Sequence, residues 1–541
     1  TPLYSSAASD VYKRQHQDSL LARLESIQLS RRQLVKAAAG AASVALTAPL
    51  FAAAQTVGGE SKVIMGYSAS VYDLDPHKNS FTVQESVLRN MYECLVAFSP
   101  DLKTLEPQLA TEWRRIDDLT MQFKLRQGVK FHSGEDFDAE AVSYSVKRML
   151  APETKAPFLS VYGSIVRADV VDKYTVHVVT KKPDPALLQR MSGFHTIIVP
   201  PKYFSTAKAE DLATKPIGTG PYKLVSWVKD ADLVMEANAN YWGPKPRIQR
   251  VIIRGIPEAG TRVAALLAGD VDIINAAPPD DIDRINKSGK AKAINIPGNR
   301  VVHYRINVAT KPLDNKLVRQ AMNYAVDWDS IIKYVLSGRG YRRATLLNPW
   351  YQCYDTEVKP FPYNPEKAKD LLKQAGVPDG FQINFHVVQG RVPKDKEVGE
   401  AIAGMLAKVG IRCNVRIIDV ATYVSQGASG KLDGLMFGSH GNWMHEPDNS
   451  LHNNYFSTSS ASRNYRGGWK SEEFDKIVEQ ARYELDGSKR CQLYTQAQKI
   501  LIDECPDIFA YAIEDVYGVN NRIRWTPRAD EMIWYKEMLP A

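Results

Sequence analysis

The residues with the richest chemistry in this sequence lie between positions 440 and 452. His440, His445 and His452 stand there beside Glu446 and Asp448. Imidazole groups bind nickel, copper and zinc, so a metal site is one interpretation of this segment. The spacings of five and seven residues between the histidines, however, match no standard helical pair of metal ligands, which stand three or four residues apart. We therefore expect polar side chains that line a wet cleft, with no metal ion and no cofactor.

The sequence contains none of the common catalytic motifs. Neither a G-x-S-x-G elbow, nor an H-E-x-x-H pair, nor a Walker phosphate loop occurs in it. Gly218-Thr219-Gly220 lacks the third glycine of a dinucleotide fingerprint, and Pro221 follows it directly, which indicates a turn. We therefore predict that the protein is not an enzyme. A secreted peptidase is the alternative, and it would need a nucleophile–base pair or a metal site.

Strand and helix patterns alternate along the chain. Residues 62–67 and 121–125 have the alternating polarity of strands, whereas residues 83–95 and 139–150 repeat apolar side chains at helical spacing. Asp138 is placed to cap the second of these helices. This alternation predicts an α/β protein. Candidate boundaries lie at proline-containing breaks, namely Pro200-Pro201, residues 216–221 and Pro278-Pro279.

Length and composition indicate a globular protein with more than one domain. The 541 residues exceed the size of an ordinary single domain. The hydrophobic fraction of 44% and the charged fraction of 24% are ordinary for a soluble protein. The net charge of +8 is spread along the chain without a dense basic run, so we predict that nucleic acid is not a partner.

Residues 1–54 have the features of an export signal. Arg31 and Arg32 precede an apolar run over residues 37–51, which is followed by Ala52-Ala53-Ala54. This apolar run is too short to span a membrane, which takes about 20 residues. The pattern is typical of a twin-arginine signal that is cleaved near Ala54-Gln55, so we expect the twin-arginine translocase as a partner during export. An amphipathic helix with two surface arginines is the alternative.

The first residues of the chain look foreign to the protein. Residues 1–15, TPLYSSAASDVYKRQ, are similar to translated adaptor sequence. The first methionine is Met65, so we expect the native start codon to lie outside this chain. The expected first segment, residues 1–54, is therefore an adaptor-like stretch followed by the signal peptide.

The cysteines do not indicate a metal or redox site. Five cysteines permit at most two disulfides, and no C-x-x-C pair occurs. Because twin-arginine cargo folds in a reducing cytoplasm, we expect a fold that does not depend on disulfides. The five residues are Cys94, Cys353, Cys413, Cys491 and Cys505.

One segment, residues 121–148, reads MQFKLRQGVKFHSGEDFDAEAVSYSVKR. Gly128 ends its strand, and Phe131 and Phe137 bracket a polar turn that contains Gly134. The segment resembles, almost word for word, the hallmark of extracellular solute-binding proteins of family 5. These are the peptide-, nickel- and opine-type receptors that feed ABC importers.

The resemblance continues in order along nearly the whole chain, and such an ordered set of matches is specific. The matching segments are LDPH at 74–77, MYECLV at 91–96, PQLA at 107–110 with Trp113, PIGTGPY at 216–222 with Trp227, NYWG at 240–243, RVAALLAGDVDI at 262–273, VRQAMNYAVD at 318–327, YNPEKAKDLLKQAG at 363–376 and RCQLYTQAQKIL at 490–501.

The resemblance implies a type II periplasmic-binding-protein fold with two lobes and an extra subdomain inserted in the first lobe. The chain would cross between the lobes near Arg305 and Tyr511, which would form the hinge. The implied boundaries are 60–98, 216–305 and 511–541 for lobe I, 99–215 for the extra subdomain, and 306–510 for lobe II.

The resemblance also implies a ligand site between the lobes. In relatives that take peptides, an aspartate pairs with the amino terminus of the ligand and an arginine receives its carboxylate. The loop that would carry this aspartate, GSHGNWMHEPDN at 438–449, has Trp443 at or near the position. Trp443 could pack under the loop or face a ligand cation through its ring. Glu446 or Asp448 could supply the missing charge, or could cap the following helix.

Arg391 is the candidate for the anionic end of a ligand, because it follows the expected strand at 381–388. A solvated loop arginine is the alternative. The remaining expected ligand contacts lie on loops after the first strand and in the 438–449 loop, and they are Tyr72, Asn79, Ser80, Phe81, His440, Asn442 and His445.

These expectations combine into one function. We expect a monomeric, soluble periplasmic receptor that binds a short peptide or a peptide-like solute and delivers it to the permease subunits of an ABC importer. A metal chelate, or an aromatic or cationic small molecule, is the alternative ligand.

Overall fold

The computed structural model describes residues 61–541 except 79–81, 158 and 230. The adaptor-like stretch, the export signal and its expected cleavage site lie outside these residues, as do Asn79, Ser80 and Phe81. Among the described helices, none combines the length and the apolar character needed to cross a membrane.

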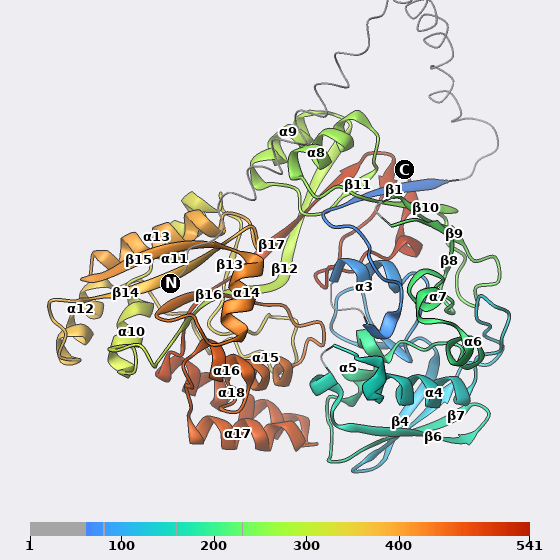
Figure 1. Ribbon diagram of the computed structural model, residues 1–541, viewed down its shortest axis with the longest axis horizontal. Helices are drawn as coiled ribbons and strands as arrows, with labels where there is room; N and C mark the ends of the chain where they lie inside the picture. The colour runs from blue at the N-terminus through green and yellow to red at the C-terminus, as the bar shows by residue number, and fades with distance from the viewer. Residues whose placement is uncertain (1–60, 79–81, 158, 230) are drawn as a thin grey trace, which may run out of the picture. The chain divides into compact units, whose positions relative to one another are not determined.

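The described residues form a mixed sheet of 11 strands that runs through two lobes (Figure 1). Its order is β15-β14-β16-β12-β17-β11-β1-β10-β9-β8, with β13 paired to β17. We call the side with β1 and β8–β11 lobe I, and the side with β14–β16 lobe II. The strands are β1 (Lys62–Tyr67), β8 (Tyr222–Trp227), β9 (Leu233–Ala237), β10 (Arg250–Gly255), β11 (Ile273–Ile274), β12 (Ala291–Ile306), β13 (Tyr341–Arg342), β14 (Phe381–Gln389), β15 (Ile411–Asp419), β16 (Leu435–His440) and β17 (Asp507–Asn520).

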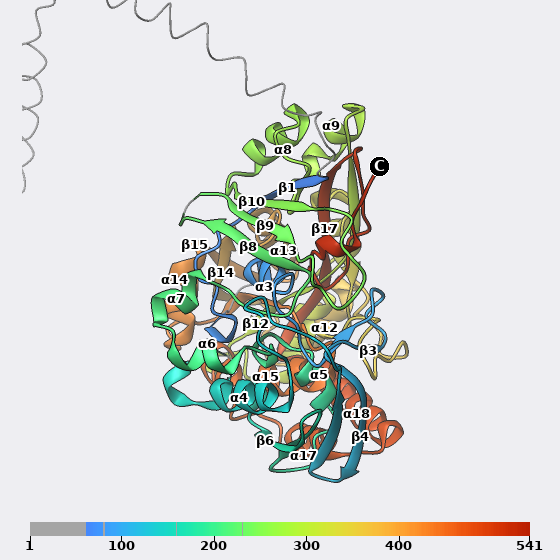
Figure 2. The same ribbon diagram turned by 90° about the vertical axis from the view of Figure 1, so that its right-hand side faces the viewer.

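Two long antiparallel strands, β12 and β17, connect the lobes (Figure 2). The first residues of β12 pair with the end of β17 beside lobe I, and its last residues pair with the start of β17 beside lobe II. Their register shifts between Pro297 and Val301. Arg305 and Tyr511, the expected crossing points, both lie on these strands, whereas the interruption of the ladder precedes Arg305 in the chain.

Lobe I packs its strands around one apolar cluster that includes Val63, Met65 and Tyr67 of β1. The helix expected over residues 83–95 ends at Leu88. The side chain of Asn90 explains the early end, because it donates to the carbonyl of Ile533 and accepts from the backbone N–H of Tyr535, both in the C-terminal segment. The helices of this lobe are α3 (Thr82–Leu88), α8 (Ala259–Ala268) and α9 (Ile282–Lys287), and the chain ends in the pair β18 (Ile523–Arg524) and β19 (Leu539–Pro540).

Lobe II has an apolar core in which Tyr304 stacks on Trp328 and meets Phe385 and Phe437 edge-on. A second cluster lies under the C-terminal helices, and a disulfide joins Cys353 to Cys491 beside it. The helices are α10 (Lys316–Tyr324), α11 (Trp328–Ser330), α12 (Pro365–Gln374), α13 (Asp395–Ala407), α14 (Val420–Ala428), α15 (Pro447–Tyr455), α16 (Ser460–Tyr465), α17 (Glu472–Tyr483) and α18 (Gly487–Glu504). The described free cysteines are Cys94, Cys413 and Cys505.

The inserted subdomain is a four-stranded antiparallel sheet, ordered β4-β5-β7-β6, that packs on α4 (Figure 1). The expected strand and helix of the hallmark segment are confirmed as β5 and α4. Asp138 caps α4 by accepting from the N–H groups of Glu140 and Ala141, as its position predicts. The elements are β2 (Val96–Phe98), β3 (Leu105–Pro107), β4 (Ala110–Asp117), β5 (Thr120–Leu125), α4 (Ala139–Leu150), β6 (Ile165–Asp172), β7 (Thr175–Thr180), α5 (Leu187–Met191), α6 (Pro201–Thr206) and α7 (Ala209–Thr214).

Candidate functional site

A cavity of about 1500 Å³ is lined by both lobes and by the inserted subdomain. Lobe I contributes residues such as Tyr67 and Asn275, the subdomain contributes Phe194, and lobe II contributes Arg391 and His440. Pockets of roughly 300–1,000 Å³ already enclose drug-sized ligands. The cavity therefore has room for a solute of that size together with water.

Several charged residues that line the cavity already have partners within the protein. Arg262 donates to backbone carbonyl groups in lobe I. Arg339 Nη1 lies 2.9 Å from Glu514 Oε2. Lys394 Nζ lies 2.9 Å from Asp280 Oδ2, and this ion pair joins the loop before α13 to lobe I. These five side chains are engaged in holding the walls of the cavity.

Four other charged side chains at the cavity make no side-chain hydrogen bond or ion pair within the described part of the chain. Two are cationic, Arg300 of β12 and Arg391 after β14. Two are acidic, Asp515 of β17 and Glu531 of the C-terminal segment. The cavity thus presents unpaired groups of both signs, which is the arrangement that a zwitterionic solute would match.

The four groups perturb one another. The guanidinium of Arg300 lowers the pKa of Arg391 to about 10, and burial adds to the effect. Burial raises the pKa of Asp515 well above its usual value, and the neighbouring carboxylate of Glu531 raises it further, while Arg300 opposes the change. Like charges that share a dry site are unfavourable to each other, so both pairs would gain from a ligand of opposite charge.

Arg391 lies where the sequence predicts it, directly after β14 and on the wall of the cavity. Gly390 precedes it with a φ of 90°, a conformation that favours glycine. The backbone N–H of Arg391 donates to Asp395 Oδ2 at 2.8 Å, which fixes this loop to the start of α13. The backbone is therefore held while the guanidinium stays available.

Trp443 lies at the cavity and also packs against the inserted subdomain. Its ring stacks on Tyr162 with centroids 5.8 Å apart and an interplanar angle of 18°. It also lies 5.5 Å from the ring of Phe194 and covers Gly193, where a Cβ atom would clash with the indole. The two interpretations of Trp443, packing residue and ligand contact, are thus compatible in one position.

His440 and His452 line the cavity as neutral imidazoles. Burial and the nearby His303 and Arg300 lower the pKa of His440 to about 3. His440 Nδ1 accepts from Asn454 Nδ2 at 3.2 Å, which leaves the proton on the other ring nitrogen. Burial, followed by the guanidinium of Arg482, lowers the pKa of His452. Tyr72 also lines the cavity, and 45% of its surface is exposed.

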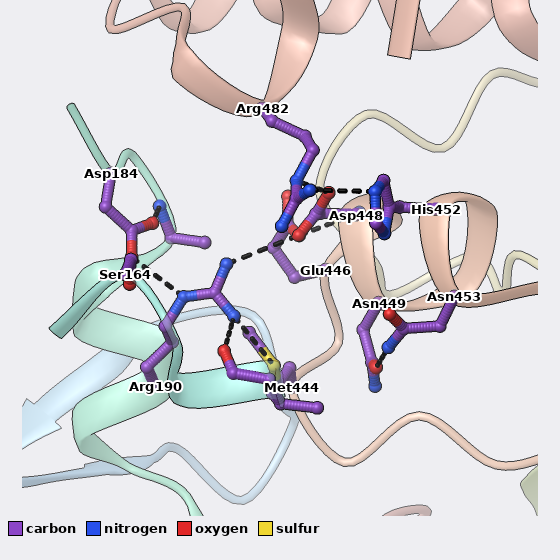
Figure 3. A network of polar contacts seen from close by, with 12 residues as sticks. Ser164, Asp184, Arg190, Met444, Glu446, Asp448, Asn449, His452, Asn453 and Arg482 are labelled. Atoms are coloured by element: carbon purple, nitrogen blue, oxygen red, sulfur yellow. Dashed lines mark hydrogen bonds and ion pairs between the residues drawn. The ribbon is translucent and has the colours of Figure 1, made fainter. Parts of the chain in front are cut away.

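Glu446 and Asp448, two further expected contacts, lie outside the cavity lining and are held by arginines. Figure 3 shows Arg190 and Arg482 beside Asp448. Glu446 caps α15 by accepting from the N–H of Asp448, and it forms an ion pair with Arg490. Asp448 lies 3.3 Å from Arg190 and 2.9 Å from Arg482. The capping interpretation of Glu446 therefore matches the structure.

Asn442 and His445 also lie behind the cavity wall. The side chain of Asn442 accepts from the backbone N–H of Met444 and donates to Ser450 Oγ, so it braces the loop from within. His445 accepts from Trp350 Nε1 at 3.1 Å, and burial lowers its pKa to about 4. Nowhere in the described residues do three His, Cys, Asp or Glu side chains come together as a metal site.

Sequence reasoning did not identify Arg300, Asp515 and Glu531 as members of the site. One signal was present, because Glu514-Asp515 interrupts the otherwise apolar run of β17. A pair of acidic residues inside a buried strand is unusual and requires a partner or a function. Arg300 and Glu531 carry no comparable local signal.

Comparison with known proteins identifies the family of this chain. Residues 104–462 match the family described as bacterial extracellular solute-binding proteins, family 5. Heme-binding protein A of Haemophilus influenzae is 31% identical over 77% of this chain and 81% of that protein. The dipeptide-binding protein of Escherichia coli K12 is 30% identical over 77% of this chain and 82% of that protein. The crystal structure of NikA from Brucella suis in complex with Fe(III)-EDTA is similar, with a TM-score of 0.79, 26% identity, and coverage of 89% of this chain and 100% of that one.

Proposed function

We propose a receptor function for this protein, because the chain belongs to the bacterial extracellular solute-binding proteins of family 5. The protein binds a small solute between its two lobes and delivers it to the permease subunits of an ABC importer. The observation that carries this proposal is the interlobe cavity with unpaired charges of both signs, Arg300 and Arg391 against Asp515 and Glu531. A site that binds by charge and burial needs no catalytic group.

The ligand class is a short peptide or a peptide-like solute with a carboxylate. Arg391 is the residue that receives the carboxylate, and Arg300 adds a second guanidinium in the same cavity. Bidentate guanidinium–carboxylate pairs are strong and directional in a water-excluded site. A few such bonds together with apolar burial are enough to reach micromolar affinity, about −8 kcal/mol.

A metal chelate, or an aromatic or cationic molecule, is the second candidate. Trp443 favours it, because an indole at the cavity offers a flat apolar face and attracts cations. The arginine pair would suit the carboxylates of a chelate equally well. The similar NikA structure was solved with Fe(III)-EDTA.

Mass spectrometry of the solute released from purified protein by mild denaturation tests this function. We expect one small molecule per protein, carrying at least one carboxylate. A separate experiment distinguishes a receptor from a peptidase. The protein is incubated with a dipeptide library, and mass spectrometry checks whether every peptide remains intact, as a receptor would leave it. Turnover of any library member would show catalysis, and binding restricted to metal chelates would replace the peptide class by the second candidate.

Export by the twin-arginine route is also part of the proposal, as is a monomeric receptor in the periplasm. Arg31 and Arg32 precede the apolar run at 37–51. Changing both to lysine should keep the precursor inside the cell, which fractionation and N-terminal sequencing would detect. Normal export of the twin-lysine variant would contradict this route. Light scattering of the purified protein measures its oligomeric state.

A further inference from the structure

The acidic pair Asp515 and Glu531 stands out among the charged groups of the cavity. Asp515 lies on β17, opposite Ile296 of β12, and its Oδ2 atom is buried without a hydrogen-bond partner among the described residues. A Cβ atom on Gly298 would lie 2.8 Å from this oxygen, so only a glycine leaves room for the carboxylate there. The absence of a side chain at Gly298 makes space for a carboxyl group that forms no ion pair within the described chain.

Glu531 lies in a segment that hydrogen bonds of its neighbour Asp530 hold in place. Its backbone has a φ of 64°, which is uncommon for a residue with a side chain. The preceding Asp530 is held by Arg528 and accepts from the N–H of Met532 at 3.0 Å. The carboxylate of Asp530 is thus used in the protein's own structure, whereas that of Glu531 lines the cavity. The segment therefore holds Glu531 at the cavity wall.

Bringing two carboxylates together in a partly dry cavity is unfavourable without a cation. The cationic groups at the cavity wall relieve it only in part. Lys394 and Arg339 are paired elsewhere, and Arg300 and Arg391 act on the two carboxyl groups without forming an ion pair with either of them in the described residues. Arg300 and Arg391, in the same cavity, are two positive charges that repel each other. A ligand with separated positive and negative ends would relieve both.

We propose that Asp515 and Glu531 form the subsite for the cationic group of the ligand, a protonated amine or a guanidinium, while Arg300 and Arg391 hold its anionic group. This inference rests on the proposed receptor function and narrows the ligand class to zwitterions. It also accounts for the tryptophan at position 443, since the cation-binding charge comes from β17 and the C-terminal segment instead of the 438–449 loop.

The test compares the wild type with the double variant Asp515→Asn/Glu531→Gln. Two probes are used, an equimolar dipeptide library with free amino groups and the same library after N-acetylation, and binding is measured by native mass spectrometry and calorimetric titration. The wild type should prefer the free amines by about 10- to 150-fold, the range for a buried charge-assisted hydrogen bond. The double variant should bind both libraries within about threefold of each other, because its amides carry no charge.

The matched control is Asp379→Asn/Glu473→Gln, which removes the same two charges from exposed positions. It should keep the wild-type preference. The melting temperature of the ligand-free double variant Asp515→Asn/Glu531→Gln should be unchanged or higher, because its substitutions remove a repulsion.

Three results would overturn the inference while leaving the receptor function intact. They are an unchanged preference for free amines in the double variant, equal binding of both libraries by the wild type, and a lower melting temperature of the ligand-free double variant, which would indicate an internal partner. If neither the wild type nor the control bound either library, the proposed peptide ligand would be wrong, and the proposed subsite for its amine would be wrong with it.

Discussion

Arg190 Nη2 on α5 of the inserted subdomain lies 3.3 Å from Asp448 Oδ2 on α15 of lobe II (Figure 3). The same guanidinium places Nε 2.8 Å from Asp184 Oδ2. Arg190 is 5% exposed, so both ion pairs are shielded from water. Although burial opposes it, the guanidinium groups of Arg482 and Arg190 lower the pKa of Asp448. One buried arginine therefore ties the subdomain to lobe II beside the 438–449 loop.

Replacing Arg190 by alanine should lower the free energy of unfolding by about 3–5 kcal/mol, because it leaves Asp184 and Asp448 buried with fewer cationic partners. Urea denaturation measures the change. Arg167→Ala is the control, since the exposed pair of Arg167 with Asp169 should contribute at most about 1 kcal/mol. Equal stabilities of the two variants would show that Arg190 is dispensable for the junction.

Arg391→Ala should weaken ligand binding by about 10- to 150-fold, the cost of one buried charge-assisted bond. The fold should be unaffected, because the guanidinium has no ion pair among the described residues and its loop is held through the backbone N–H. Calorimetric titration with the dipeptide library and thermal melting measure the two effects. Arg416→Ala on β15, outside the cavity lining, should change neither. A large drop in melting temperature with unchanged affinity would make Arg391 a structural residue.

Trp443→Ala should reduce both affinity and stability. The indole is half-buried, stacks on Tyr162 and packs at a tilt against Phe194, so truncation should cost up to about 3–5 kcal/mol of stability, the range for large buried aromatics. Trp443→Phe retains an aromatic face and should recover most of the stability. Melting curves and titrations of both variants separate the two roles. Full affinity in the alanine variant would leave packing as the role of Trp443.

The fold was predictable where local signals and the family resemblance agree. Asp138 at the start of α4 and Gly128 and Gly134 with φ of 74° and 90° act through neighbouring residues, so their sequence positions suffice to predict the turn and the helix. The helix after residue 82 was predicted too long because Asn90 is held by the distant C-terminal segment. A periodic pattern cannot show such a tertiary contact.

The site was less predictable, because partners far apart in sequence decide which charges are free. Asp448 is held by Arg190, 258 residues away, and Glu446 by Arg490, 44 residues away. Neither arginine stands out in the sequence. Asp515 became a candidate only when the structure showed it beside the cavity without a partner. The 438–449 loop, expected from the family motif, does reach the cavity wall with His440 and Trp443, but its carboxylates Glu446 and Asp448 lie outside the cavity lining.

His132, in the hallmark segment, should make the free energy of unfolding depend on pH. Its Nε2–H donates to the carbonyl of Gly220 at 3.0 Å, and its Nδ1 accepts from the N–H of Gly218 at 3.3 Å. Both nitrogens are thus used by the neutral ring, and a second proton would face the N–H of Gly218. Burial lowers the pKa of His132 to about 4, whereas the hydrogen bond to Gly220 opposes the shift.

Because this pKa is below the unfolded value of about 6.5, the unfolded chain binds a proton that the folded chain does not bind between pH 6.5 and 4. His132 therefore makes the folded state lose at most about 1.4 kcal/mol per pH unit as the pH falls through this window. His132→Gln lacks the titrating ring, so its unfolding free energy should fall less steeply than that of the wild type by the same amount. Urea denaturation at intervals between pH 7 and 4 measures both slopes. Parallel slopes would mean that His132 is protonated equally in the folded and unfolded states, against the hydrogen bonding seen at Gly218 and Gly220.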